Sequence, residues 1–278
     1  MTEHTGWQYY KNALLPTCPP HEQADTAPIV NGELWRKGVL LARWTEDFDC
    51  PQKTEWWYVI KDTPFDIMGC NSNTRYKINK GSKRFRVEQI DPAAHIEDIY
   101  QVQVAAYGQY PAKYRPTVDK EKLTQSILGW DKEKVFVYAA YFRETDAFAG
   151  YILLSKNGDC LELTAQKVKP EYEKHQINAA LVYHVLQQWH SFLAGEGYIC
   201  DGARNIQHET AFQDYLEQYF HFRKAYCRLC IAYPPKLAWA VGLLYGFRGI
   251  LKRLDGIGIV HKINGVLQME QIVRKDRG

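Results

Sequence analysis

The chain has 278 residues, of which 46% are hydrophobic, 14% aromatic and 24% charged. This composition is typical of globular proteins, and the aromatic content excludes a largely disordered chain. Lysine and arginine exceed aspartate and glutamate by only three, 35 against 32, which is too small a charge to argue for a nucleic-acid-binding protein, and we expect no DNA partner. The first residues, MTEHTGWQYYKN, carry no cationic start followed by an apolar run, so we expect a cytoplasmic protein.

Two short strands and a basic run are predicted in residues 1–84, which we interpret as an N-terminal extension. The first 30 residues contain four prolines and predict an irregular leader. Residues 39–44 and 56–60 predict the strands. The basic run between Arg75 and Arg86 holds six cations and no acid. Such a run is typical of a solvated face, and the alternative is a patch that binds an anionic ligand.

A mixed α/β domain is predicted for residues 85–235. Asp91 and Pro92 supply an N-cap and a first-turn proline for a helix. Asn157 and Gly158 predict a hairpin turn, because both residue types tolerate a positive φ. The order of strands and helices predicted for this domain matches neither a doubly wound sheet nor a sandwich. The predicted elements are a strand at 86–90, a helix after 92, a helix at 118–128, strands at 135–143, 148–155 and 160–168, a helix at 177–193, a strand at 198–201, a helix at 212–220 and a strand at 222–233.

Seven scattered cysteines are expected to be packing residues. Cys227 and Cys230 form a CxxC on a predicted strand, where residues three apart face opposite sides of the sheet. That geometry is poor for a shared zinc ion, so we expect no metal.

A motif follows the third strand of the predicted meander, where the strand leads into a helix. It resembles the pattern V-x-P-x-(Y/W)-(R/Q)-x-x-G-x-(G/A)-x-x-L of the GNAT superfamily of acyl-CoA-dependent N-acyltransferases. The matching residues are Val168, Pro170, Tyr172, Ile177, Ala180 and Leu181.

Three residues depart from this pattern. Glu173 stands where the family has Arg or Gln, and Gln176 and Asn178 stand where it has glycines. In the family, the glycines let backbone N–H groups surround the pyrophosphate of coenzyme A at a helix N-terminus. Asn adopts the required backbone angles more readily than Gln. The departures therefore weaken the implication of coenzyme A more than the implication of the fold.

A second likeness lies in residues 210–222, which occupy the place of the family's N-x-x-A-x-x-x-Y-x-x-x-G-F segment. Tyr215 and Tyr219 flank the position where the family has its tyrosine. The resemblance covers residues 85–235, so it implies a GNAT-like acyltransferase fold with an N-terminal extension and a C-terminal helical tail at 236–278.

The resemblance implies attack of an amine on an acyl thioester, with acetyl-CoA or another acyl-CoA as co-substrate and no metal. The amine must lose a proton, and the developing oxyanion needs a fixed donor. Glu162 is the candidate base, Tyr215 or Tyr219 the candidate acid, and a backbone N–H near Lys167 or Val168 the candidate oxyanion donor. The other predicted site residues are Lys174, His175, Gln176 and Asn178 for the cofactor, and Arg204 and His208 for the substrate.

Three functions stay open at this point. The leading one is an N-acyltransferase that acts on a small-molecule or peptide amine. The second is a Fem-type transferase, whose GNAT-like domain takes an aminoacyl-tRNA in place of coenzyme A; the basic run favours it and the small net charge does not. The third is a catalytically silent GNAT-like binding module.

The C-terminal tail predicts a helix at 236–254 that is apolar nearly all round. Arg248, Lys252 and Arg253 gather at its end, where cations suit the helix dipole. Two interpretations compete, packing on the N-terminal strands of the same chain and peripheral contact with an anionic membrane surface. The apolar residues around the whole helix favour packing.

Overall fold

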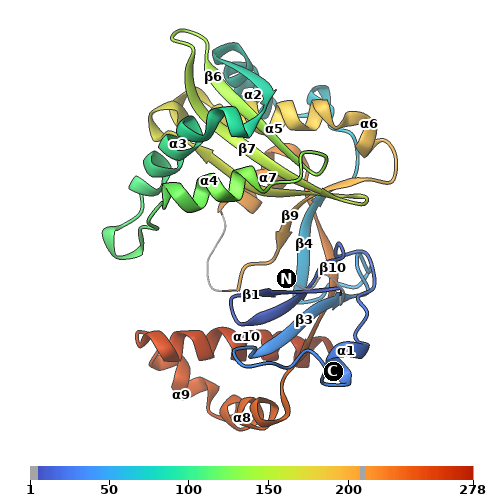
Figure 1. The fold of residues 1–278 in the computed structure, drawn as a ribbon. Coiled ribbons are helices and arrows are strands. Elements are labelled where there is room, and N and C mark those ends of the chain that lie inside the picture. The colour runs from blue at the N-terminus through green and yellow to red at the C-terminus, as the bar shows by residue number, and fades with distance from the viewer. Residues whose placement is uncertain (1–5, 207–210, 278) are drawn as a thin grey trace. The chain divides into compact units, whose positions relative to one another are not determined.

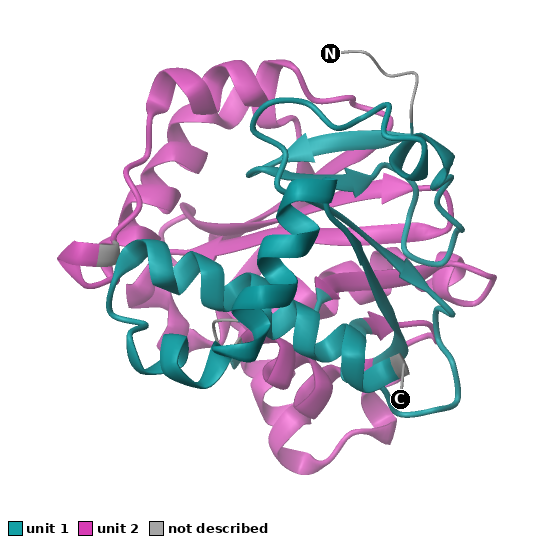
Figure 2. Ribbon diagram, turned by 90° about the horizontal axis from the view of Figure 1, so that it is seen from below, with its two compact units in different colours: residues 1–59, 203–211, 224–278 teal, residues 60–202, 212–223 magenta. Residues whose placement is uncertain are grey.

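The computed structural model describes residues 6–206 and 211–277. The chain forms two compact units, each assembled from separated segments (Figure 2). Unit 1 comprises residues 1–59, 203–211 and 224–278, and unit 2 comprises residues 60–202 and 212–223.

The sheet of unit 2 has the strand order β9-β8-β7-β6-β5. Strands β5 to β8 are antiparallel neighbours, while β8 and β9 pair in parallel. Gly158, with a φ of 57°, forms the predicted hairpin turn, and Asn157 pairs with Cys160 across it. The three-stranded meander is therefore confirmed.

Helices cover both faces of this sheet (Figure 1). Val137 and Ala139 of β6 pack in a core cluster with residues of α3 and α4. Tyr138, which points to the other face, contacts His184 of α5 and accepts a hydrogen bond from Trp189 at 3.1 Å. Because successive side chains of β6 point to opposite faces of the sheet, this strand packs against helices on both sides.

Most elements of unit 2 lie where the sequence predicts them. Two differ: the long helix predicted at 177–193 is interrupted at Trp189, and the basic run is itself largely helical. The elements are α2 (Ser72–Arg84), β5 (Phe85–Ile90), α3 (Ile96–Gly108), α4 (Lys120–Leu128), β6 (Val135–Phe142), β7 (Ala147–Asn157), β8 (Cys160–Val168), α5 (Ile177–Gln188), α6 (His190–Leu193), β9 (Tyr198–Ala203) and α7 (Ala211–Phe220), with short 3-10 helices at Ile67–Gly69, Pro92–His95, Ala112–Tyr114 and Pro170–His175.

Unit 1 begins with a hairpin, so the prediction of an irregular leader is wrong. Lys11 and Asn12 take positive φ values of 46° and 69°, which form the tight turn between β1 and β2. Trp7 is buried, and its indole N–H donates to the carbonyl of Asp25 at 2.7 Å. The prolines that suggested a leader lie at the end of β2 and beyond it.

The C-terminal tail contains three helices in place of one. The predicted helix is interrupted at Phe247, and a third helix, α10, follows it. Ile272 and Val273 of α10 pack with Trp56 of β4, whereas no residue of α8 or α9 is buried. The predicted helix at 236–254 is therefore not buried on all sides, and α10 supplies the contact with strand β4.

The sheet of unit 1 has the strand order β1-β2-β3-β10-β4. Within the described residues, no helix is long and apolar enough to cross a membrane. The elements of this unit are β1 (Trp7–Tyr10), β2 (Ala13–Pro16), α1 (Ala27–Val30), β3 (Leu41–Glu46), β4 (Trp56–Lys61), β10 (Arg223–Ala232), α8 (Pro235–Gly246), α9 (Arg248–Arg253) and α10 (Gly258–Arg277).

Candidate functional site

Strands β8 and β9 separate partway along their length. They pair over only three positions, ending where Glu162 faces Cys200. Strand β8 continues for six further residues to Val168, paired with β7 on its other edge. One extra residue, Thr164, forms a bulge there, since Leu153 pairs with Ala165 and Leu154 with Leu163. Beyond Glu162, the edge of β8 that faces away from β7 is no longer paired with β9.

Backbone N–H groups of β8 point toward that edge. The N–H of Lys169 donates to the carbonyl of Ala149 at 2.8 Å, which shows that every second residue counted back from Lys169 directs its N–H to β7. The N–H of Lys167 therefore faces β7, and the N–H groups of Gln166 and Val168 face the edge that β9 leaves. Of the two positions predicted for an oxyanion donor, only Val168 directs its N–H to that side.

The loop before α5 keeps a glycine-like backbone without the glycine. Gln176 takes φ 66° and ψ 38°, the left-handed conformation that glycine adopts most easily. Asn178, in the first turn of α5, accepts a hydrogen bond from the side chain of Gln166 at 2.7 Å. Two amide side chains thus join β8 to the beginning of α5.

Helix α2 contacts the first turn of α5 through Gly81. A Cβ atom on Gly81 would lie 2.5 Å from the carbonyl oxygen of Gln176 and 3.1 Å from the nitrogen of Ala180. The backbones of the two helices are therefore in direct contact. Helix α2 contains no acid and five cations, Arg75, Lys77, Lys80, Lys83 and Arg84. Arg84 pairs with Glu144, and Arg75 donates to the carbonyl of Cys70 at 2.6 Å. Lys77, four residues before Gly81, lies on the side of α2 that contacts α5.

Two carboxyl groups with raised pKa values lie where β8 and β9 separate. Burial raises the pKa of Asp201 to about 7; a hydrogen bond from Gln213 opposes this shift and the charge of Glu162 adds to it. The side chain of Glu162 is exposed as a whole, but protein atoms shield its carboxyl group from water, and this desolvation raises the pKa of Glu162. Asp201 was not among the predicted site residues, although it begins the polar segment that contains Arg204.

The two candidate tyrosines lie together on α7, with ring centroids 5.1 Å apart. Burial raises the pKa of Tyr215, and its hydroxyl group has no hydrogen-bond partner among the described residues. The ring of Tyr219 lies 4.4 Å from the ammonium group of Lys77. Tyr219 thus contacts the basic helix, while the hydroxyl group of Tyr215 is enclosed.

The other predicted residues of unit 2 have different surroundings. The ammonium group of Lys167 lies 4.8 Å from the ring centroid of Tyr107, and burial lowers the pKa of Lys167. His175 packs against Phe142 with centroids 5.2 Å apart, and Lys174 is exposed.

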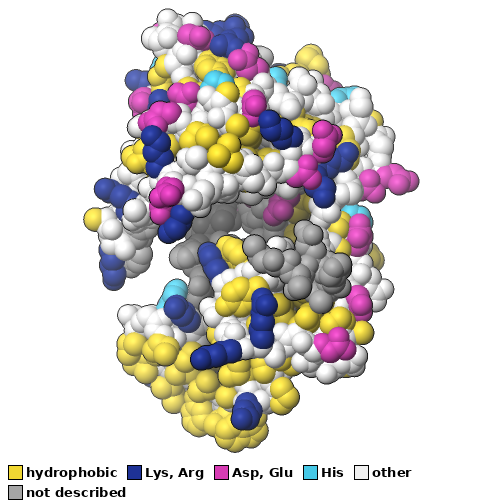
Figure 3. All heavy atoms as spheres, viewed as in Figure 1, with side chains coloured by type: hydrophobic (Ala, Val, Ile, Leu, Met, Phe, Trp, Pro, Cys, Tyr) yellow, Lys and Arg dark blue, Asp and Glu magenta, His cyan; other side chains and the backbone are white. Residues whose placement is uncertain are grey.

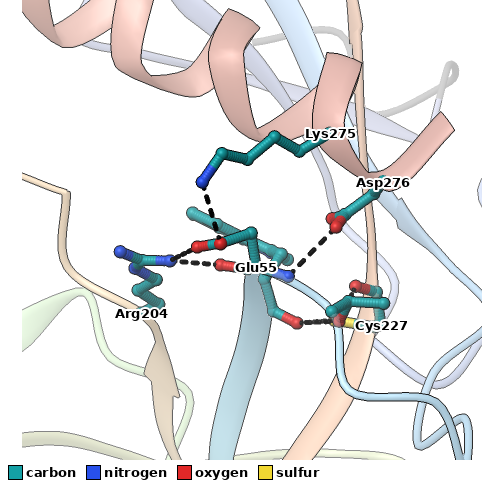
Figure 4. Close-up of polar contacts among 7 residues, drawn as sticks. Glu55, Arg204, Cys227, Lys275 and Asp276 are labelled. Carbon is teal, nitrogen blue, oxygen red and sulfur yellow. Dashed lines mark hydrogen bonds and ion pairs between the residues drawn. The ribbon is translucent and has the colours of Figure 1, made fainter. Parts of the chain in front are cut away.

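Arg204 belongs to unit 1 and is held by other residues there (Figure 4). Its guanidinium group donates to the carbonyl of Glu55 at 2.5 Å and to the carboxylate of Glu55 at 3.0 Å, and it lies 4.5 Å from the ring centroid of Trp57. Lys275 also pairs with Glu55, and the two cations lower the pKa of that carboxyl group. A substrate role for Arg204 stays a prediction, and His208 lies outside the described residues.

The residues at α5 fit the pyrophosphate of coenzyme A poorly. The helix N-terminus and the cations of α2 favour phosphate. Against this, Gln176 adds a side chain where close backbone approach needs glycine, and Glu171 and Glu173 add negative charge in the preceding turn. Lys174, in the same turn, offsets one of these two charges, so the loop adds no net positive charge and α2 is the source of the cations near this end of α5.

No protein-family model and no curated protein sequence matches the chain. Several solved structures do match. L-PGS from Bacillus licheniformis matches with 15% identity and a TM-score of 0.51, over 82% of this chain and 79% of that chain. FemX matches with 8% identity and a TM-score of 0.51, over 81% and 73%. A C-terminal DUF2156 domain from Agrobacterium fabrum matches with 10% identity and a TM-score of 0.54, over 84% and 82%.

The chain has a GNAT-superfamily fold. The order of elements in unit 2 agrees with this fold, from β5 through the meander and α5 to β9 and α7. A mixed α/β architecture of the GNAT type is thus confirmed. The predicted domain boundaries and site residues stay predictions.

Proposed function

We propose that the GNAT-like unit 2 transfers an aminoacyl group from aminoacyl-tRNA to an amine. The observation that carries this proposal is the basic helix α2 in backbone contact with the first turn of α5. The contact at Gly81 places positive charge beside the helix end that holds the donor's phosphates in the GNAT superfamily.

The donor's chemistry distinguishes this proposal from acyl-CoA use. A tRNA presents several backbone phosphates, which suit a row of cations along a helix. Coenzyme A needs a tight cradle for one pyrophosphate, and Gln176 narrows that cradle. The matches to FemX and to L-PGS, over more than four-fifths of this chain, support a donor of the Fem type.

Asp201 and Val168 supply the chemistry in this proposal. A carboxyl group with a pKa of about 7 is suited to accept a proton near neutral pH. Asp201 follows Cys200, which is opposite Glu162 of β8, so it lies several residues along the strands from Val168, a separation of roughly 13–16 Å. Asp201 therefore takes the proton of the attacking amine through intervening water. The amine nitrogen bonds to the ester carbonyl carbon, and the N–H of Val168 donates to the resulting oxyanion. The C–O bond to the tRNA ribose then breaks, the carbonyl forms again, and the ribose oxygen takes up the proton that Asp201 received.

The test compares two radiolabelled donors, charged tRNA and acetyl-CoA, each with a panel of amino sugars and peptides. Loss of the aminoacyl ester from tRNA gives a readout that does not depend on knowing the acceptor. We expect transfer from charged tRNA. The variant Lys77→Glu/Lys80→Glu should reduce this transfer. The control Lys37→Glu/Lys53→Glu, which reverses two exposed charges on unit 1, should leave it unchanged.

Transfer from acetyl-CoA alone would replace this proposal with the N-acyltransferase. Transfer from neither donor, with tRNA still bound, would support the silent binding module.

A further inference from the structure

The segment from α8 to the beginning of α10 carries a concentration of exposed apolar side chains. Among the described residues, sixteen large apolar side chains are exposed, and seven of them lie between residues 239 and 259. Their exposed fractions run from 47% to 74%, and no residue of α8 or α9 is buried. We call these seven residues the tail face; they are Trp239, Leu243, Phe247, Ile250, Leu254, Ile257 and Ile259.

The tail face is divided among several short elements. Trp239 and Leu243 are four residues apart in α8, which puts them on one side of that helix, and Ile250 lies in α9. Phe247 and Leu254 lie at the ends of α9, Ile257 lies in the following turn, and Ile259 lies in the first turn of α10. Figure 3 shows the apolar surface over α8 and α9 interrupted by basic side chains.

Residues 235–262 are cationic. They contain one acid, Asp255, which accepts a hydrogen bond from Asn264 at 2.6 Å and lies 2.9 Å from His261. The guanidinium carbon of Arg248 lies 4.4 Å from the ring centroid of Tyr245. The segment thus combines apolar and positive surface; its cations are Lys236, Arg248, Lys252, Arg253 and Lys262.

Helix α10 fixes this face to unit 1. Leu267, Ile272 and Val273 are buried, and Asn264 donates to the carbonyl of Leu251 at 3.0 Å, which ties α9 to α10. The helices that carry the tail face are therefore anchored by a packed helix. A face so anchored keeps its exposed area unless another surface covers it.

We propose that the tail face docks onto the surface of an anionic lipid bilayer, with α8 and α9 lying in the plane of the interface. Helices of 12 and 6 residues are far shorter than the roughly 20 residues that cross a bilayer. Tryptophan and phenylalanine suit the interface, and lysine and arginine attract anionic headgroups. A second copy seated on the same face would bring five cations against five, so charge favours the lipid over self-association.

The experiment is co-sedimentation of the full-length protein with phosphatidylcholine vesicles, made with and without phosphatidylglycerol. The apolar variant is Trp239→Ser/Leu243→Ser. Its control is Met68→Ser/Leu128→Ser, which removes equally exposed apolar side chains from unit 2. Circular dichroism confirms that each variant is folded.

The charge variant is Lys252→Glu/Arg253→Glu, with Lys37→Glu/Lys53→Glu as its control. Each basic residue near an anionic surface contributes about 1 kcal/mol, so we expect the charge variant to lower vesicle binding at least about tenfold. High salt should weaken the binding of the unmodified chain.

We expect binding to anionic vesicles only, lost in both tail variants and kept in both controls. Absence of binding, or equal binding by the variants, would overturn the proposal. A dimer in light scattering that the apolar variant abolishes, without vesicle binding, would assign the face to a second copy.

Discussion

Replacement of Gly81 by alanine tests the contact between α2 and α5. In a helix interior, alanine is more favourable than glycine by about 1 kcal/mol. At Gly81 the new Cβ would lie 2.5 Å from a carbonyl oxygen of α5, and a backbone atom cannot rotate away as a side chain can. Overpacking of this kind costs about 1–3 kcal/mol. Because the clash is with backbone, we take the upper part of that range and expect a net loss of about 1–2 kcal/mol.

The assay is thermal and denaturant unfolding of the two alanine variants Gly81→Ala and Gly108→Ala. Gly108 ends α3, and a Cβ atom there would meet no atom within 4 Å. For a domain of this size, 1 kcal/mol shifts the melting temperature by about 2–4 °C. We therefore expect Gly81→Ala to melt about 2–8 °C lower and Gly108→Ala to melt no lower. A Gly81→Ala variant as stable as the unmodified chain would refute the close contact.

Three further predictions concern the candidate site. The pKa of Asp201 is raised from 3.8 to about 7, so between these pH values the folded state holds a proton that the unfolded state has lost. The free energy of unfolding of the unmodified chain, relative to that of Asp201→Asn, should therefore fall as pH rises from about 4 to about 7. A difference in urea unfolding that does not change with pH would contradict the shift. Tyr215→Phe removes a buried hydroxyl group that has no hydrogen-bond partner among the described residues, so the free energy of unfolding should stay within about 1 kcal/mol of that of the unmodified chain. A fall in kcat without loss of stability would identify Tyr215 as the acid. Glu173→Arg should tighten binding of the phosphate-bearing donor, and weaker binding in a titration would mean that Glu173 faces elsewhere.

Local patterns were sufficient for most of unit 2. The alternation of apolar residues in residues 160–168 and the turn residues before them predict β8 and its hairpin. The Val168–Pro170 junction, followed by an apolar stripe, predicts α5. In these segments the local preference and the final packing agree, so the sequence alone predicts the element.

Three features depend on contacts that no local pattern reveals. The basic run is helical although Gly81 lowers its helix propensity; Asn71 caps the helix by accepting from the N–H of Thr74 at 2.9 Å, and Gly81 packs against α5, a contact that the sequence does not reveal. The raised pKa of Asp201 depends on burial beside a distant strand. The exposed face of α8 arises because α10 takes the core position, and composition alone favoured α8 for it.

Binding of two donors tests the central claim most directly. A charged tRNA whose ester is replaced by a stable amide is titrated into the full-length protein, and coenzyme A is added as competitor. We expect saturable binding that falls with salt, weakens in Lys77→Glu/Lys80→Glu, and resists coenzyme A. Displacement of the tRNA by coenzyme A, or binding indifferent to the two lysines, would contradict the proposed donor site.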